Sequence, residues 1–196
     1  MTDSAGVVEL TGPAPPLVVV DTSAAVCALI DDEPQHDQYA DFFERAIRAG
    51  TELVYCELVD FELVHAATRI ALKRELGKRW RSHTGDPTYL PAVRDLTREL
   101  FDRWLGLLSQ TSSIRLPLGP LGGNDPSTSV RDAAFGLLDR YPIGSYDAAH
   151  AATAILAGAP LVCRDAGFSR IPADTLTLIT DRGRAQTCRE QRRTHT

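Results

Sequence analysis

Four acidic residues stand among apolar or small residues, where an isolated carboxylate is unusual. Asp21 ends the apolar run "LVVV", and Asp165 follows "LVC" in the segment "APLVCRDAGF". Glu62 lies within "CELVDFELVHAATR", and Asp147 lies within "GSYDAAHAATAILAG". Uncompensated carboxylates repel one another, so a cluster of them requires a cation. Hard oxygen ligands without His or Cys select Mg²⁺ or Mn²⁺ rather than zinc, which is the chemistry that convergence of these acids would indicate.

Each acid also has an ordinary structural explanation when it is taken alone. Asp21 fits the N-cap of a following helix, and Asp165 fits a turn. Asp147 fits the first turn of a helix, where the helix dipole favours the ionised form. A functional interpretation therefore depends on whether the fold brings the acids together.

Short apolar runs alternate with helical patterns along the chain, which predicts an α/β fold with a mostly parallel central sheet of about five strands. The runs are rich in Val, Leu and Ile, as expected of strands buried on both faces. We predict strands at 17–21, 53–56, 113–117, 160–164 and 175–179. We predict helices at 23–30, 35–49, 58–76, 91–108, 128–140 and 146–157.

This arrangement explains why a buried strand would end on an acid. In parallel α/β sheets, ligands bind at the carboxyl ends of the strands, near the point where the strand order reverses. Asp21 and Asp165 lie at the carboxyl ends of two predicted strands, so they share one edge of the sheet if both strands are central. Glu62 lies near an apolar helix face, whereas Glu57 and Asp60 fall at angles that favour solvent exposure.

Composition limits the function classes. Of the 196 residues, 43% are apolar and 24% charged, as is typical of a soluble globular domain. The net charge of -5 argues against a protein that coats nucleic acid through its bulk charge. The four cysteines are scattered and form no CxxC pair, which disfavours a zinc site or a disulfide framework.

The chain divides into three predicted regions. Residues 1–16, acidic and proline-bearing, are expected to form a flexible leader without the features of a secretory signal, so the protein is expected to be cytoplasmic. Residues 17–181 form the α/β domain, with a helical extension at 71–110 and a glycine-rich loop at 119–127. Residues 182–196 form a polar, basic tail that is expected to be mobile. No apolar run approaches the roughly 20 residues that span a bilayer, so no membrane partner is expected.

Four segments, "VVVDTSA", "ELVDFELVHA", "YDAAHAATA" and "LVCRDAGF", occur in an order and with separations that resemble the PIN-domain ribonucleases. The likeness covers roughly residues 17 to 180 and is strongest to the VapC-type toxins of bacterial toxin–antitoxin pairs. It implies a three-layer fold with an acidic pocket that binds one or two Mg²⁺ or Mn²⁺ ions. Asp21, Glu62, Asp147 and Asp165 match the acidic quartet of the family, and Ser23 matches a hydroxyl that often follows the first acid.

The resemblance implies a metal-dependent endoribonuclease that leaves a 5′-phosphate and a 3′-hydroxyl. It also implies a homodimer and a small VapB-like antitoxin that blocks the site, by inserting Arg or Lys among the acids. The chain is longer than a typical small VapC-type toxin. The leader, the glycine-rich loop and the basic tail are extra, which leaves the substrate and the partner open.

The stretch "RIALKRELGKRWR", residues 69–81, has six basic residues and one acid, and it is predicted to continue the helix that carries Glu62. An RNA strand guided toward the metal is one interpretation; a solvated helix face and a contact for an acidic antitoxin segment are the others. The RNA-binding candidates are Lys73, Arg74, Lys78 and Arg79, with Trp80 available to stack on an unpaired base. His65 and His150, near the two helical acids, are interpreted as structural.

Two other functions remain open at this point. A phosphatase of the haloacid-dehalogenase type also has an aspartate after its first strand, but it expects a second acid two residues later, where this chain has Ser23. A PIN-like module with an inactive site that works through protein contacts would not need four mutually repelling carboxylates.

Overall fold

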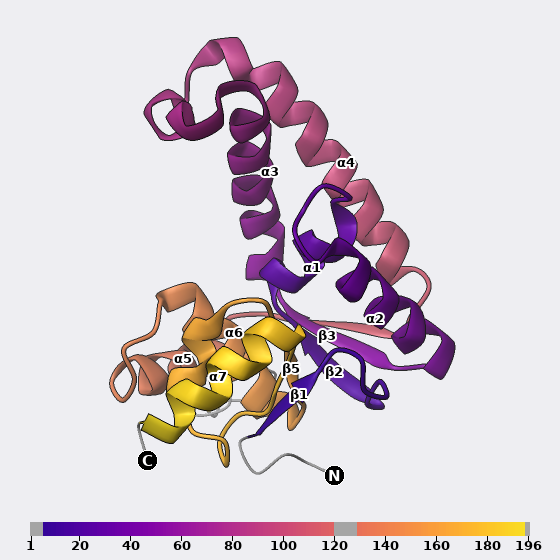
Figure 1. The fold of residues 1–196 in the computed structure, drawn as a ribbon, viewed down its shortest axis with the longest axis vertical. Coiled ribbons are helices and arrows are strands. Elements are labelled where there is room, and N and C mark those ends of the chain that lie inside the picture. The colour runs from indigo at the N-terminus through magenta and orange to yellow at the C-terminus, as the bar shows by residue number, and fades with distance from the viewer. Residues whose placement is uncertain (1–5, 120–128, 195–196) are drawn as a thin grey trace.

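A computed structural model describes residues 6–119 and 129–194, except for the side chains of residues 193 and 194. In this part of the chain, six strands form one parallel sheet in the order β1-β6-β5-β2-β3-β4 (Figure 1). The strands are β1 (Val7–Glu9), β2 (Leu17–Val20), β3 (Glu52–Cys56), β4 (Ser113–Leu116), β5 (Leu161–Val162) and β6 (Leu178–Thr180).

Helices cover both faces of the sheet. The α-helices are α1 (Thr22–Leu29), α2 (His36–Ala49), α3 (Leu58–Leu76), α4 (Leu90–Leu108), α5 (Val130–Leu138), α6 (Ser145–Ala157) and α7 (Arg182–Thr194). Among the described residues there are also the short 3-10 helices η1 (Gly77–His83), η2 (Pro87–Tyr89) and η4 (Ala166–Arg170). The described residues include no helix with both the length and the apolar character that crossing a membrane requires.

The sequence of β2 explains how one sheet supports two cores. Successive side chains of a strand point to opposite faces, so Val18 and Val20 enter one core and Val19 enters the other. All three are fully buried. The first core is completed by α1 to α4 and the second by α5, α6 and α7, which gives the three-layer α/β arrangement expected from the sequence.

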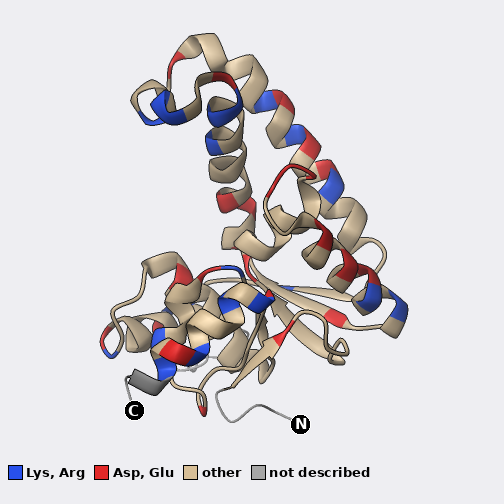
Figure 2. Ribbon diagram, viewed as in Figure 1, with Lys and Arg blue, Asp and Glu red and all other residues tan. Residues whose placement is uncertain are grey.

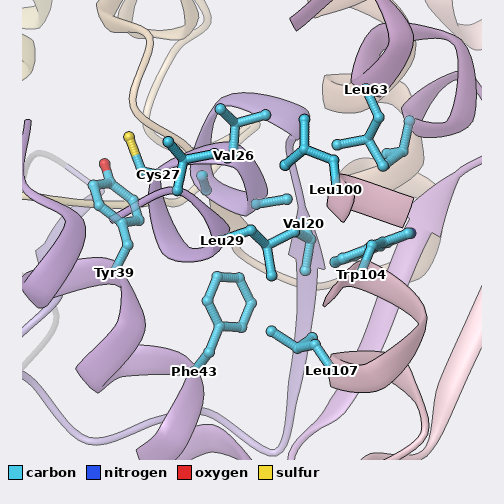
Figure 3. Packing of buried hydrophobic residues seen from close by; sticks show 14 of the residues in the cluster. Val20, Val26, Cys27, Leu29, Tyr39, Phe43, Leu63, Leu100, Trp104 and Leu107 are labelled. Carbon is cyan, nitrogen blue, oxygen red and sulfur yellow. The ribbon is translucent and has the colours of Figure 1, made fainter. Parts of the chain in front are cut away.

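The helices α3 and α4 lie side by side and extend away from the sheet (Figure 1). Figure 3 shows how their lower turns are anchored: Leu63 of α3 and Leu100 and Trp104 of α4 pack in the same cluster as Val20. Burial of these side chains, which excludes apolar surface from water, fixes the pair against the sheet. We call α3, η1, η2 and α4 the helical arm.

The prediction of a flexible leader over residues 1–16 is wrong for part of that range. Val7–Glu9 forms the edge strand β1, which pairs with β6 so that Val7 lies opposite Leu178. A run of three residues beside glycine and proline gives too weak a strand pattern to be recognised, and the pairing partner lies far away in the sequence. The sheet therefore has one more strand than the five expected.

The prediction of a mobile tail over residues 182–196 is also wrong for the described part. Residues 182–194 form α7, whose first turn is capped by Asp181 Oδ1 accepting from the amides of Gly183 and Arg184, both at 3.1 Å. Ala185, Cys188 and Arg192 are buried, and the Arg192 guanidinium donates to the carbonyls of Gly6 and Leu176. Because residues 182–194 are mostly polar, their sequence did not predict this helix, which is held by long-range contacts. The glycine-rich loop predicted at 119–127 lies outside the described residues, apart from Gly119.

Candidate functional site

The strand order places two of the four acids side by side. From β2 the chain continues to β3 and β4 on one side of the sheet, and later returns to β5 and β6 on the other. Asp21 directly follows β2, and Asp165 follows β5, the strand hydrogen-bonded to β2. The amide of Asp21 donates to the carbonyl of Val162 at 3.0 Å. Both acids therefore lie at the point where the strand order reverses, which is where parallel α/β sheets bind ligands.

Two helices bring the remaining acids to the same point. Glu62 lies in the second turn of α3, and Asp147 lies in the first turn of α6. All four predicted acids, together with Ser23, line one pocket of about 700 Å³. The neighbouring acids on α3 and before it are engaged elsewhere: Glu57 accepts from the amide of Leu118, and Asp60 pairs with Arg115. The convergence expected from the sequence is therefore present in the fold.

Asp21 is held by the first turn of α1. Its carboxylate accepts from the amide of Ser23 at 3.1 Å and from the Ser23 hydroxyl. That hydroxyl oxygen in turn accepts from the amide of Arg164 at 3.0 Å, which ties the first turn of α1 to the loop after β5. Burial raises the pKa of Asp21 above its ordinary value, although His150 and Ser23 oppose the increase.

His150 connects two of the acids. Its fully buried ring places Nε2 2.6 Å from Glu62 Oε2 and 3.6 Å from Asp21 Oδ1. Burial alone would lower the pKa of His150, but the hydrogen bond to Glu62 and the charge of Asp21 outweigh it and raise the pKa. Burial would raise the pKa of Glu62, yet His150 and the hydroxyl of Thr22 outweigh burial and lower it. Glu62 is therefore held in its ionised form.

His150, which is interpreted as structural from the sequence alone, lies among the acids in the structure. The signal was present: His150 follows Asp147 by three residues on one helix, so the two side chains share a face. Its contact with Glu62 spans 88 positions in the sequence and depends on where the sheet places α3 and α6.

The carboxylates of Asp147 and Asp165 both lie close to Gly167. A Cβ atom on that residue would lie 3.2 Å from Asp165 Oδ1 and 3.7 Å from Asp147 Oδ2. The amide of Gly167 donates to Asp165 Oδ1 at 2.7 Å. Burial, followed by the charges of Asp165 and Asp21, raises the pKa of Asp147 to about 6. A cation beside these carboxylates would oppose the part of this increase that comes from the two neighbouring charges.

The donor set fits a hard divalent cation in its chemistry. The pocket offers carboxylate oxygens, as Mg²⁺ and Mn²⁺ prefer, and glycine leaves space beside two of them. Within residues 6–119 and 129–194, no three His, Cys, Asp or Glu side chains already stand at metal-ligand spacing. Asp21, Glu62, Asp147 and Asp165 are the carboxylates that could hold such a cation, and His150 and Thr22 both engage the same oxygen of Glu62, Oε2.

The basic residues predicted to bind RNA do not share one surface. The basic stretch 69–81 was expected to continue the helix of Glu62. Instead, α3 ends at Leu76 and the rest of the stretch forms η1. Arg74 makes two hydrogen bonds to Asp32, at 3.1 and 2.6 Å, outside the acidic pocket. Lys73, Lys78 and Trp80 line a second pocket of about 460 Å³, Trp80 also lines the acidic pocket, and Arg79 lines neither.

Comparison with known proteins agrees with this architecture. A family model of the PIN domain matches residues 18–174. A search of curated proteins finds no match. Among solved structures, the chain is similar to the crystal structure of VapBC2 from Rickettsia felis bound to a DNA fragment from their promoter, with 18% sequence identity and a TM-score of 0.51. The alignment covers 84% of this chain and 98% of that one. The match over residues 18–174, on a fold whose acids converge as described, shows that the chain belongs to the PIN domain family.

Proposed function

We propose that this protein is a metal-dependent endoribonuclease, and that it is the toxin of a VapBC-type pair. The observation that carries the proposal is the convergence of Asp21, Glu62, Asp147 and Asp165 in one pocket. Two further findings support it. PIN domains are generally nucleases, and the similar Rickettsia felis structure is a toxin–antitoxin complex.

The carboxylates divide into two groups by their surroundings. Asp21, Asp147 and Asp165 would hold Mg²⁺ or Mn²⁺. Such a cation would neutralise charge that develops on the scissile phosphate and lower the pKa of an attacking water. Glu62 would orient that water and accept its proton, because His150 and Thr22 fix one of its oxygens and its lowered pKa keeps it ionised.

A substitution at His150 is expected to test this division. His150→Ala removes the 2.6 Å contact with Glu62, so the orientation of that carboxylate is lost while the four acids remain. We expect kcat to fall by about 10- to 100-fold, the range found when a partner that orients a metal-site carboxylate is removed. His150→Gln keeps a donor near the same place and should recover part of kcat. Equal loss in both variants, with native melting temperatures, would contradict a positioning role.

The proposed activity is distinguished from its rivals by three assays. With Mg²⁺ or Mn²⁺, an RNA oligonucleotide should be cut to products that carry a 5′-phosphate and a 3′-hydroxyl. A small phosphate ester should be left intact, whereas a phosphatase of the haloacid-dehalogenase type would hydrolyse the ester. Calorimetric titration with Mn²⁺ should show uptake; no uptake together with no RNA cleavage would favour an inactive binding module.

The antitoxin and the homodimer belong to the same proposal. An antitoxin that inserts a basic side chain among the acids would place positive charge beside Asp21, Asp147 and Asp165, which line the same pocket. Co-expression with the product of the neighbouring upstream gene tests this partner, because a cognate antitoxin should copurify and block RNA cleavage. Light scattering of the purified chain tests the dimer.

A further inference from the structure

We propose that α3 carries a track for single-stranded RNA, formed by Arg69, Lys73 and Trp80 with Tyr146 beside the acids. This inference rests on the proposed nuclease function and deepens it, since it assigns the binding of the strand beside the scissile phosphate to residues of the helical arm.

The acidic pocket is elongated in the direction of the arm. Its lining starts at the acids, follows α3 through His65 and Arg69, and reaches Trp80 in η1. Trp80 also lines the second pocket, whose wall includes Lys73. Trp80 therefore belongs to both linings, and we place the strand along α3 from the acids to this residue.

The polar side chains on this path have a regular spacing. His65, Arg69 and Lys73 are four residues apart, so they form one stripe on α3, and all three are exposed. An α-helix rises 1.5 Å per residue, which places successive members about 6 Å apart along the axis. That step is comparable with the separation of successive phosphates along an extended single strand. Figure 2 shows Lys and Arg on the upper part of α3 and on the turns after it, with acids at the base of the helix.

Arg74 is not part of this stripe, so the proposed track is specific to Arg69 and Lys73. Arg74 follows Lys73 directly, but neighbouring residues on a helix point in different directions, and its guanidinium pairs with Asp32. Among the described residues, no ion pair engages Arg69 or Lys73 within 4 Å. Their charges therefore remain available for phosphates.

Aromatic side chains mark the path as one for unpaired bases. Tyr146, which is 46% exposed, precedes Asp147 and lines the acidic pocket. Trp80 lies at the far end, and the Arg81 guanidinium lies 5.6 Å from its ring centroid. Bases stack on such aromatic surfaces only when they are not paired, so the pattern favours a single strand over a duplex. An acidic peptide would use the cations but has no bases to stack on the rings.

The test measures RNA binding separately from cleavage. In an Asp21→Asn background with Mg²⁺, the affinity for a fluorescein-labelled single-stranded RNA is measured by anisotropy between about 50 and 200 mM salt. Combining Arg69→Ala with Lys73→Ala should weaken binding at least about tenfold and reduce the slope of log K against log salt by about 1.4, or 0.7 for each lost phosphate contact. Trp80→Ala should weaken binding and leave the slope unchanged. Arg98→Ala, an exposed cation on α4 that lines neither pocket, should change nothing.

The outcomes separate the track from the nuclease. An unchanged salt slope in the double variant would overturn the track even if the wild-type protein cuts RNA. Loss of binding to a poly-glutamate peptide, with RNA binding intact, would overturn it in favour of a protein partner. Duplex RNA binding as tightly as the single strand would also contradict it. If RNA binding depends on the track but the wild-type protein cuts no RNA, the track stands and the proposed activity fails.

Discussion

Replacing Asp21 by Asn is expected to reduce RNA cleavage by about a thousandfold or more, equivalent to about 4 kcal/mol of lost transition-state stabilisation. Asp21 is 5% exposed, lies at the centre of the acidic pocket and faces both His150 and Glu62. Asparagine has nearly the same shape, so its side-chain oxygen can still cap α1 by accepting from Ser23, and the fold should be retained. Single-turnover cleavage of an RNA oligonucleotide in Mg²⁺ measures the effect.

Asp60→Asn provides a matched control for this experiment. Asp60 lies on the same helix as Glu62, but it pairs with Arg115 and does not line the acidic pocket. It should keep wild-type cleavage, whereas Asp21→Asn loses it. Metal-dependent cleavage that survives in Asp21→Asn would reject the role assigned to that carboxylate. Circular dichroism and melting curves of both variants establish that any loss comes from the site.

Asp147→Asn is expected to stabilise the metal-free protein at pH 7 while it abolishes cleavage. The pKa of Asp147 rises from 3.8 to about 6 in the folded protein, because of burial and the neighbouring charges of Asp165 and Asp21. Between these values the folded state binds more protons than the unfolded state, so ionisation of Asp147 lowers stability as the pH rises from about 4 to about 6. A neutral amide avoids that loss. After allowance for partial exposure, the gain at pH 7 is about 1–2 kcal/mol.

The pH dependence distinguishes this effect from a general change in packing. The melting temperature of Asp147→Asn should exceed that of the wild-type protein by a few degrees at pH 7, with the difference vanishing near pH 4, where the wild-type carboxyl is protonated. Addition of Mg²⁺ should raise the melting temperature of the wild-type protein more than that of the variant. A variant that is no more stable at pH 7 than at pH 4, relative to wild type, would contradict the raised pKa of Asp147. The expected result would show that ionised Asp147 lowers the stability of the metal-free protein, as is common for residues that serve function.

Much of the fold was predictable because its central strands carry strong local signals. The run "LVVV" before Asp21 is apolar at every position, which is what a strand buried on both faces requires. Placing Asp21 and Asp165 at the carboxyl ends of such strands was enough to predict that they meet. The helices of the arm were also predictable, since their apolar positions repeat at helical spacing.

The edge of the sheet formed by β1 was not predictable, because its stability comes from contacts with residues far away in the sequence. The strand β1 has only three residues and is held by its pairing with β6. The helix α7 is composed mostly of polar residues. Arg192 joins the two regions by donating to the carbonyl of Gly6 across 186 positions. No local pattern records an interaction of that range.

The sequence by itself predicted which residue types would carry the proposed chemistry: four carboxylates, each placed at the end of a strand or on the inner face of a helix. Only the tertiary structure decided how they are coupled. It placed the His150 ring between Glu62 and Asp21, and it directed Lys73 toward the Trp80 pocket while Arg74 turned to Asp32. The physical reason is that periodicity fixes the face on which a side chain lies, whereas its partner on another element depends on how the elements pack.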